Sequence, residues 1–261
     1  MNKDICRILV AVLASASLAG AAERNTGGDA PLPKSPNVLT PPEKLKKGGP
    51  VNILYAPSEA DDPAYRAAIA AITGGTVDYF DAVSGTPTVA QMAPYDCVYT
   101  WANFAYANNV LMGDNMAAFV DGGGRAILGA FCTFTSGNFL SGQIMTPAYC
   151  PVVSPSGTNH FSNSSYAGDG VSCIHSGELV PVTTYACTFR DFLTLQGGGV
   201  QDGSYLDNEI AHAFRVGDGA VVYSNGSGAS QLGCTGQWAA LIANICACTT
   251  LPVELQGISV E

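Results

Sequence analysis

The sequence offers one cysteine where a nucleophile could act. Cys132 directly follows residues 125–131 (RAILGAF), an apolar run that predicts a buried strand. A thiol at a strand end becomes nucleophilic when a neighbouring base takes its proton, and His160 is the candidate base. The alternative is that Cys132 is simply buried, or disulfide-bonded, at the end of its strand.

Two other segments could bind a ligand. Trp101 and Asn103 follow a predicted strand, and a ring beside an amide can stack on and hydrogen-bond a sugar. Equally, Asn103 could cap a helix while the aromatic residues pack. Ser227 and Gly228 lie between a strand and a helix, where backbone N–H groups could bind an anion or a sugar. Gln231 stands where a dinucleotide loop needs its third glycine, so we expect no nucleotide cofactor.

The cysteines favour disulfide bonds. All nine except Cys6 follow the N-terminal segment, and an even number in an exported chain is typical of a disulfide framework. Cys97 lies inside a predicted strand, where a buried thiol fits as well as a bridge. At least one bridge is expected among the cysteines that lie mostly in loop-rich sequence, namely Cys150, Cys173, Cys187 and Cys234. No cysteine–histidine spacing matches a zinc site, so no metal is expected.

The N-terminus predicts export. In residues 1–22, Lys3 and Arg7 precede an apolar run and small residues that suit signal peptidase, although a short membrane anchor is the alternative. Residues 23–50 form a proline-rich linker, 51–250 the folded domain and 251–261 a strand-like tail. No later apolar run is long enough to span a bilayer. We therefore expect a periplasmic, cell-surface or extracellular protein without a membrane span in its mature chain.

The charge balance limits the possible partners. The chain has 11 Lys and Arg against 21 Asp and Glu, a net charge of −10. So few cations argue against nucleic acid, whose phosphates must be neutralised, and against anionic membrane surfaces.

Strand and helix patterns alternate between residues 51 and 131. Apolar runs at 51–56, 96–101 and 125–131 are separated by helical patterns, including 109–121 before three glycines. This order predicts an α/β fold with a mostly parallel sheet between helices, and a ligand at the carboxyl ends of its strands. From 132 to about 203 the sequence is rich in Gly, Ser, Thr and Asn, which predicts a loop-rich insertion with a few short strands, such as one within 175–187. A hairpin at 210–224 and a helix at 237–247 close the domain.

With these elements placed, the chain resembles the class I glutamine amidotransferase-like superfamily, in particular its trehalose-utilisation-type branch, which lacks amidotransferase activity. Three segments carry the resemblance: VNILYA with its following helix; YDCVYTWANF with a helix ending in VDGGG and then RAILGAF; and FRVGDGAVVYSNG with GQWAALIANI. The resemblance covers residues 51 to about 249 and implies a flavodoxin-like three-layer sandwich.

The resemblance also implies that the nucleophile site is degenerate. Active members carry a cysteine on a sharp turn flanked by glycines, as G-x-C-x-G, with a histidine and a glutamate later in the chain. Here Gly129 stands three residues before Cys132, and Phe134 occupies the second glycine position. No paired His-x-Glu follows late in the chain.

We therefore expect an exported, non-catalytic domain that acts as an extracellular binding or assembly module, with a carbohydrate or surface partner. A secreted hydrolase acting on carbohydrate or a glycoconjugate, using Cys132 and His160, is the first alternative. The second is a structural surface protein that self-associates through residues 251–261, by adding the tail as a strand to a neighbour's sheet.

Overall fold

The computed structural model describes residues 49–215, 220–228 and 232–249, all within one compact unit that spans Ser35–Glu261. The expected signal peptide, most of the linker and the tail lie outside the described residues. No helix within the described residues has the length and apolar character that crossing a bilayer requires.

A seven-stranded sheet forms the centre, in the order β2-β1-β3-β4-β11-β10-β9. Neighbouring strands from β2 to β11 pair in parallel. Strand β10 pairs antiparallel with both of its neighbours, β11 and β9. The strands are β1 (Ile53–Tyr55), β2 (Val77–Tyr79), β3 (Cys97–Thr100), β4 (Arg125–Leu128), β9 (Gly199–Gln201), β10 (His212–Arg215) and β11 (Val221–Ser224). The predicted mostly parallel, flavodoxin-like sheet is confirmed.

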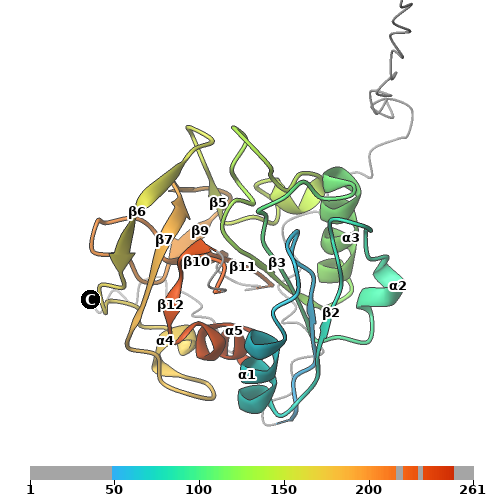
Figure 1. Ribbon diagram of the computed structural model, residues 1–261, viewed down its shortest axis with the longest axis horizontal. Coiled ribbons are helices and arrows are strands. Elements are labelled where there is room, and N and C mark those ends of the chain that lie inside the picture. The colour runs from blue at the N-terminus through green and yellow to red at the C-terminus, as the bar shows by residue number, and fades with distance from the viewer. Residues whose placement is uncertain (1–48, 216–219, 229–231, 250–261) are drawn as a thin grey trace, which may run out of the picture. The chain divides into compact units, whose positions relative to one another are not determined.

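Helices cover both faces of the sheet because the strand order changes direction at β1. The connection from β1 to β2 runs one way along the sheet and that from β3 to β4 the other, so right-handed crossovers place α1 (Pro63–Thr73) and α3 (Asn109–Asp121) on opposite faces. Helix α5 (Trp238–Ala247) packs beside α1, and the short α2 (Val89–Met92) lies near α3 (Figure 1). Every residue of β1, β3 and β4 is buried, as a sheet covered on both faces requires.

Local signals set the helix ends. The Asp62 carboxylate accepts a hydrogen bond from the Tyr65 N–H, and Pro63 begins α1 without losing a bond. Gly74, at φ 68°, ends the helix in a left-handed conformation. The Asn108 side chain caps α3 in the same way, through the Leu111 N–H.

The insertion after β4 is more regular than its composition suggests. A second sheet runs in the order β12-β7-β6, and a pair of short strands joins β5 to β8. The elements are a 3₁₀ turn (Gln143–Met145), β5 (Val152–Val153), β6 (Asn159–Ser165), α4 (Cys173–Ser176), β7 (Tyr185–Asp191), β8 (Thr194–Leu195) and, after β11, β12 (Thr235–Gly236). The sequence suggested strand over 175–187. The structure instead has α4 capped by Ser172, and the strand begins only at Tyr185.

Three disulfides fasten these parts together: Cys97–Cys246, Cys173–Cys248 and Cys187–Cys234. Of the four cysteines among which a bridge was expected, Cys187 and Cys234 pair with each other, and Cys173 pairs with Cys248. Cys150 is the exception, because it lies buried and unbridged with its thiol 3.2 Å from the Val152 carbonyl oxygen.

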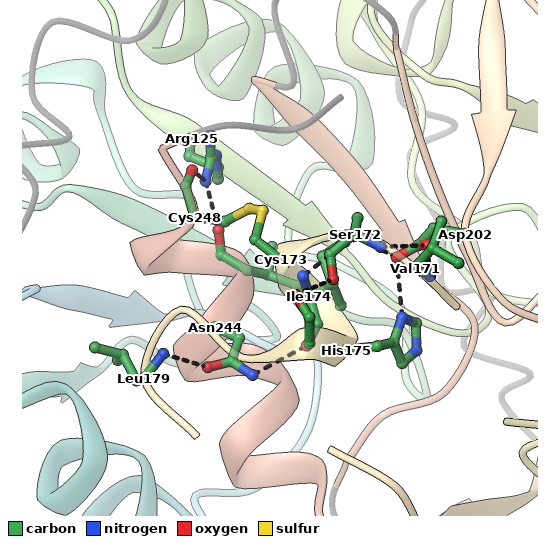
Figure 2. The surroundings of a disulfide bond; sticks show 12 residues. Arg125, Val171, Ser172, Cys173, Ile174, His175, Leu179, Asp202, Asn244 and Cys248 are labelled. Atoms are coloured by element: carbon green, nitrogen blue, oxygen red, sulfur yellow. Dashed lines mark hydrogen bonds and ion pairs between the residues drawn. A yellow bond between two sulfur atoms is a disulfide. The ribbon is translucent and has the colours of Figure 1, made fainter. Parts of the chain in front are cut away.

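The C-terminal end of α5 is anchored from several directions. Cys246 binds it to β3 and Cys248 to α4, as Figure 2 shows for the second bridge. The buried Arg125 of β4 donates to the carbonyl oxygens of Ile245 and Cys248, which the end of a helix leaves unpaired.

Candidate functional site

The turn after β4 holds its strained residue one position earlier than the sequence suggested. Phe131 has φ 67°, in the left-handed region that bulky residues rarely adopt. Gly129 stands two residues before it, where a Cβ atom would lie 2.7 Å from the Cβ of Trp101. A strand-to-helix elbow presents its nucleophile from such a strained position. In this chain the residue with that backbone conformation is Phe131 rather than Cys132, and turns rather than a helix follow it; we call this segment the elbow.

Cys132 lies behind the elbow, inside the core. Its thiol is fully buried, 3.8 Å from the Tyr106 hydroxyl and 4.0 Å from the Thr100 carbonyl oxygen. Burial raises the pKa of Cys132 far above its ordinary value, because a thiolate loses its hydration there. The group is a packed thiol rather than an activated one.

His160 faces away from that region. On β6 its Nε2 lies 3.0 Å from a carboxylate oxygen of Glu209, and its ring lies tilted against that of Phe192, with the ring centroids 3.8 Å apart. Successive side chains of a strand point to opposite faces, so His160 lies on the face opposite its neighbour Asn159. No hydrogen bond joins His160 to Cys132 among the described residues, and the suggested catalytic pair does not form.

A buried carboxylate occupies the inner side of the elbow. Asp191 Oδ2 accepts hydrogen bonds from the Phe131 N–H at 2.9 Å, the Thr133 hydroxyl at 2.8 Å and the Tyr223 hydroxyl. The Asn225 side chain bonds to the backbone N–H and C=O of Asp191 and so fixes its strand. Burial raises the pKa of Asp191 to about 6, against the lowering effect of these donors.

A pocket of about 410 Å³ opens outside this elbow. Phenyl rings and side-chain amides make up most of its wall, and none of its lining residues carries a charge. The lining residues are Asn103, Phe131, Phe134, Gly137, Asn138, Asn159, Phe161, Phe189 and Leu232. Residues following β3 and β4 contribute to it, so it lies at the carboxyl edge of the parallel strands, where a ligand is expected. We call it the phenylalanine–asparagine pocket.

Of the four sequence-suggested ligand residues, only Asn103 lines this pocket. Its amide nitrogen donates to Glu59 Oε2 at 2.6 Å. Trp101 is fully buried, and its ring N–H donates to the Tyr55 hydroxyl, so it is a core residue.

The loop after β11, which holds Ser227 and Gly228, packs against the rest of the protein. Ser227 is inaccessible, and its N–H lies 3.4 Å from the sulfur of Cys234. A Cβ atom at Gly228 would lie 2.1 Å from the Tyr65 hydroxyl, so this loop packs against α1. Neither residue lines the pocket.

The sequence also gave no sign of a second polar network. Asp202 holds His175 Nδ1 at 2.9 Å, His175 Nε2 lies 3.0 Å from the Tyr185 hydroxyl, and that hydroxyl lies 3.2 Å from His212 Nδ1. All four side chains are buried, and the Ser172 hydroxyl adds a bond to Asp202 (Figure 2). The pKa of Asp202 is lowered by its bonds from His175 and Ser172 despite burial. This network ties α4 to the two sheets.

Within the part of the chain that the structure describes, no three His, Cys, Asp or Glu side chains gather as metal ligands.

Solved structures with related folds have very different sequences. Cytoplasmic Protein STM3548 from Salmonella typhimurium matches with a TM-score of 0.53 and 12% identity, over 74% of this chain and 97% of that chain. A putative ThuA-like protein from Bacteroides uniformis matches at 0.42 and 9%, over 77% and 91%. A glutamine amidotransferase from Thermotoga maritima matches at 0.42 and 11%, over 67% and 74%.

No protein-family model matches the sequence, and no curated protein does. At these identities the likeness concerns the fold and not the activity. The fold is the mostly parallel α/β architecture that the sequence predicts, and the Salmonella protein shares it.

Proposed function

We propose that this chain is an exported binding module without catalytic activity, whose ligand lies in the phenylalanine–asparagine pocket. The elbow after β4 carries the proposal, because it holds Phe131 where an enzyme of this fold would hold its nucleophile. A phenyl ring cannot attack a carbonyl. The N–H of the next residue, Cys132, which would face a developing oxyanion in such an elbow, instead donates to the Gly129 carbonyl oxygen at 3.2 Å.

The disulfides support the exported location. Thiols stay reduced in the cytosol, whereas six cysteines of this chain are paired. The word cytoplasmic in the name of the Salmonella protein describes that protein.

The geometry disfavours a hydrolase that uses Cys132 and His160, because the thiol is buried and the histidine faces away. The self-assembly hypothesis rests on residues 251–261, outside the described residues, and stays a prediction.

The first test measures thiol reactivity in the native protein. Cys132 and Cys150 should react with an aromatic disulfide reagent only after unfolding, since both thiols are buried. The substitution Phe131→Cys should add one thiol that reacts in the native state, because that position lines the pocket. Rapid native reaction of Cys132 would contradict the proposal.

The second test measures turnover. Release of ammonia from glutamine and of nitrophenol from an ester should not exceed that of Cys132→Ala. A saturable activity that this substitution abolishes would establish an enzyme instead.

A further inference from the structure

The rings of the pocket stand close together. Phe131 lies 5.3 Å from Phe134 and 6.2 Å from Phe189, measured between ring centroids, and Phe189 lies 5.8 Å from Phe161. Several phenyl faces around one space form the kind of site in which an organic cation is attracted to the negative ring faces.

The pocket also holds an acceptor without a donor. Asn159 is 4% exposed, and its Oδ1 accepts no hydrogen bond from any described residue. A buried oxygen of this kind is costly to leave unpaired, so it is a specific place for a ligand N–H or O–H.

Negative charge lies directly behind the wall. Asp191 pairs with Asn159 across the β6–β7 ladder, so the two side chains share a face of the sheet. Its Oδ1 is also buried and unpaired among the described residues. Glu59, bonded to Asn103, is a second buried carboxylate at the wall.

The nearby arginine does not balance this charge. Arg190 precedes Asp191 on β7 and therefore lies on the opposite face, where it forms two bonds to Asp207. No lining residue is positively charged.

We propose that the phenylalanine–asparagine pocket binds a primary organic ammonium, with an N–H group donated to Asn159 Oδ1 and the charge held by the phenyl faces and the carboxylates behind them. This inference rests on the proposed binding function and adds the chemical class of the ligand. An anionic ligand would meet two carboxylates and no cation. A neutral sugar could use the amides but would gain nothing from the charge, and Trp101 is not available to stack on it.

The test is calorimetric titration of the whole chain at neutral pH with three probes. Cyclohexylammonium carries both charge and N–H donors, cyclohexanol has a similar ring without charge, and tetramethylammonium has charge without donors. We expect cyclohexylammonium to bind at least about tenfold more tightly than cyclohexanol. Tetramethylammonium should fall between them.

Two variants locate the binding. Phe161→Ala removes a ring that is 72% exposed at the rim, so the fold should be kept, and affinity for cyclohexylammonium should fall several-fold. Phe104→Ala, 53% exposed and outside the lining, is the matched control and should change nothing. Asn159→Leu should weaken cyclohexylammonium about tenfold but leave tetramethylammonium, which has no donor, unchanged, with circular dichroism confirming that the variant folds.

The outcomes separate the two proposals. Equal affinity for cyclohexanol, or tighter binding of methyl glucoside in the same pocket, would overturn the ammonium inference and leave the binding function standing. Binding that Phe161→Ala and Asn159→Leu do not affect would place the cation on the acidic surface and also overturn it. If none of the probes binds at millimolar concentration, the inference is wrong, and the thiol and turnover tests decide the proposed function.

Discussion

Single residues around the elbow support the proposal that this domain binds a ligand without catalysis. Phe131 occupies the strained position, Cys132 is packed in the core, and the buried Asp191 accepts a hydrogen bond from the Phe131 N–H. A buried carboxylate with one unpaired oxygen is expensive in its charged form. The protonation state of Asp191 therefore affects the free energy of unfolding.

Asp191→Asn should change how stability depends on pH. Burial raises the folded-state pKa of Asp191 to about 6, above the value of about 3.9 in an unfolded chain. Between these values the folded state binds more protons, so this group makes the free energy of unfolding fall as pH rises from about 4 to about 6. The difference is about 2–3 kcal/mol. Urea unfolding at both pH values should show that this part of the slope is missing in the variant.

Asp81→Asn is the control for that experiment. Asp81 is partly exposed, and its hydrogen bond from Ser84 lowers its pKa, so its contribution to the slope has the opposite sign. It should leave the Asp191 contribution intact. An unchanged slope in Asp191→Asn would mean that Asp191 titrates as it does in the unfolded chain.

At the scale of elements, how well the sequence predicts a helix or strand depends on what stabilises that element. The strands β1, β3 and β4 and helix α3 carry their own apolar pattern, and each was predicted within three residues at either end. Strand β6 reads NHFSNSS and has no such pattern. It forms because it pairs with β7, a partner far along the chain, and single-sequence periodicity cannot reveal that.

The site was predictable to the same extent. The rule that ligands lie at the carboxyl ends of parallel strands pointed to Asn103, and Asn103 lines the pocket. Phe131 was missed because a left-handed backbone at a phenylalanine leaves no sign in the sequence. Asn159, Phe161 and Phe189 come from the insertion, whose pairing was not visible.

Removal of the bridge between α4 and α5 should destabilise the domain. Cys173→Ser with Cys248→Ser opens a loop with a sequence separation of 75, and the cost should be about 2–5 kcal/mol in the free energy of unfolding. Cys150→Ala, which removes a buried thiol but no bridge, is the control and should cost about 1 kcal/mol. Equal losses in urea unfolding would show that the bridge adds nothing.

For the whole molecule, charge and crosslinks point to the same environment. The chain has a net charge of −10 and only 12% charged residues, so few surface ion pairs are available to hold it together. Three long-range disulfides supply a constraint that does not depend on ionic conditions, and they fit the proposed export to an oxidising compartment. An acidic surface also favours the approach of cations over anions.

The redox state of the cysteines tests this view of the whole chain. In protein made in an oxidising compartment and alkylated after unfolding without reductant, only Cys132 and Cys150 among the described cysteines should be labelled, because the other six are paired. Intact mass and peptide mapping measure the labels. Protein made in a reducing cytosol should label at all of them and unfold at a lower urea concentration, since each missing bridge leaves the unfolded chain less constrained. A bridge that includes Cys132 would contradict both the pairing and the packing of the thiol behind the elbow. Equal stability of the two preparations would show that the fold does not depend on oxidation, and the disulfides would then no longer argue for export.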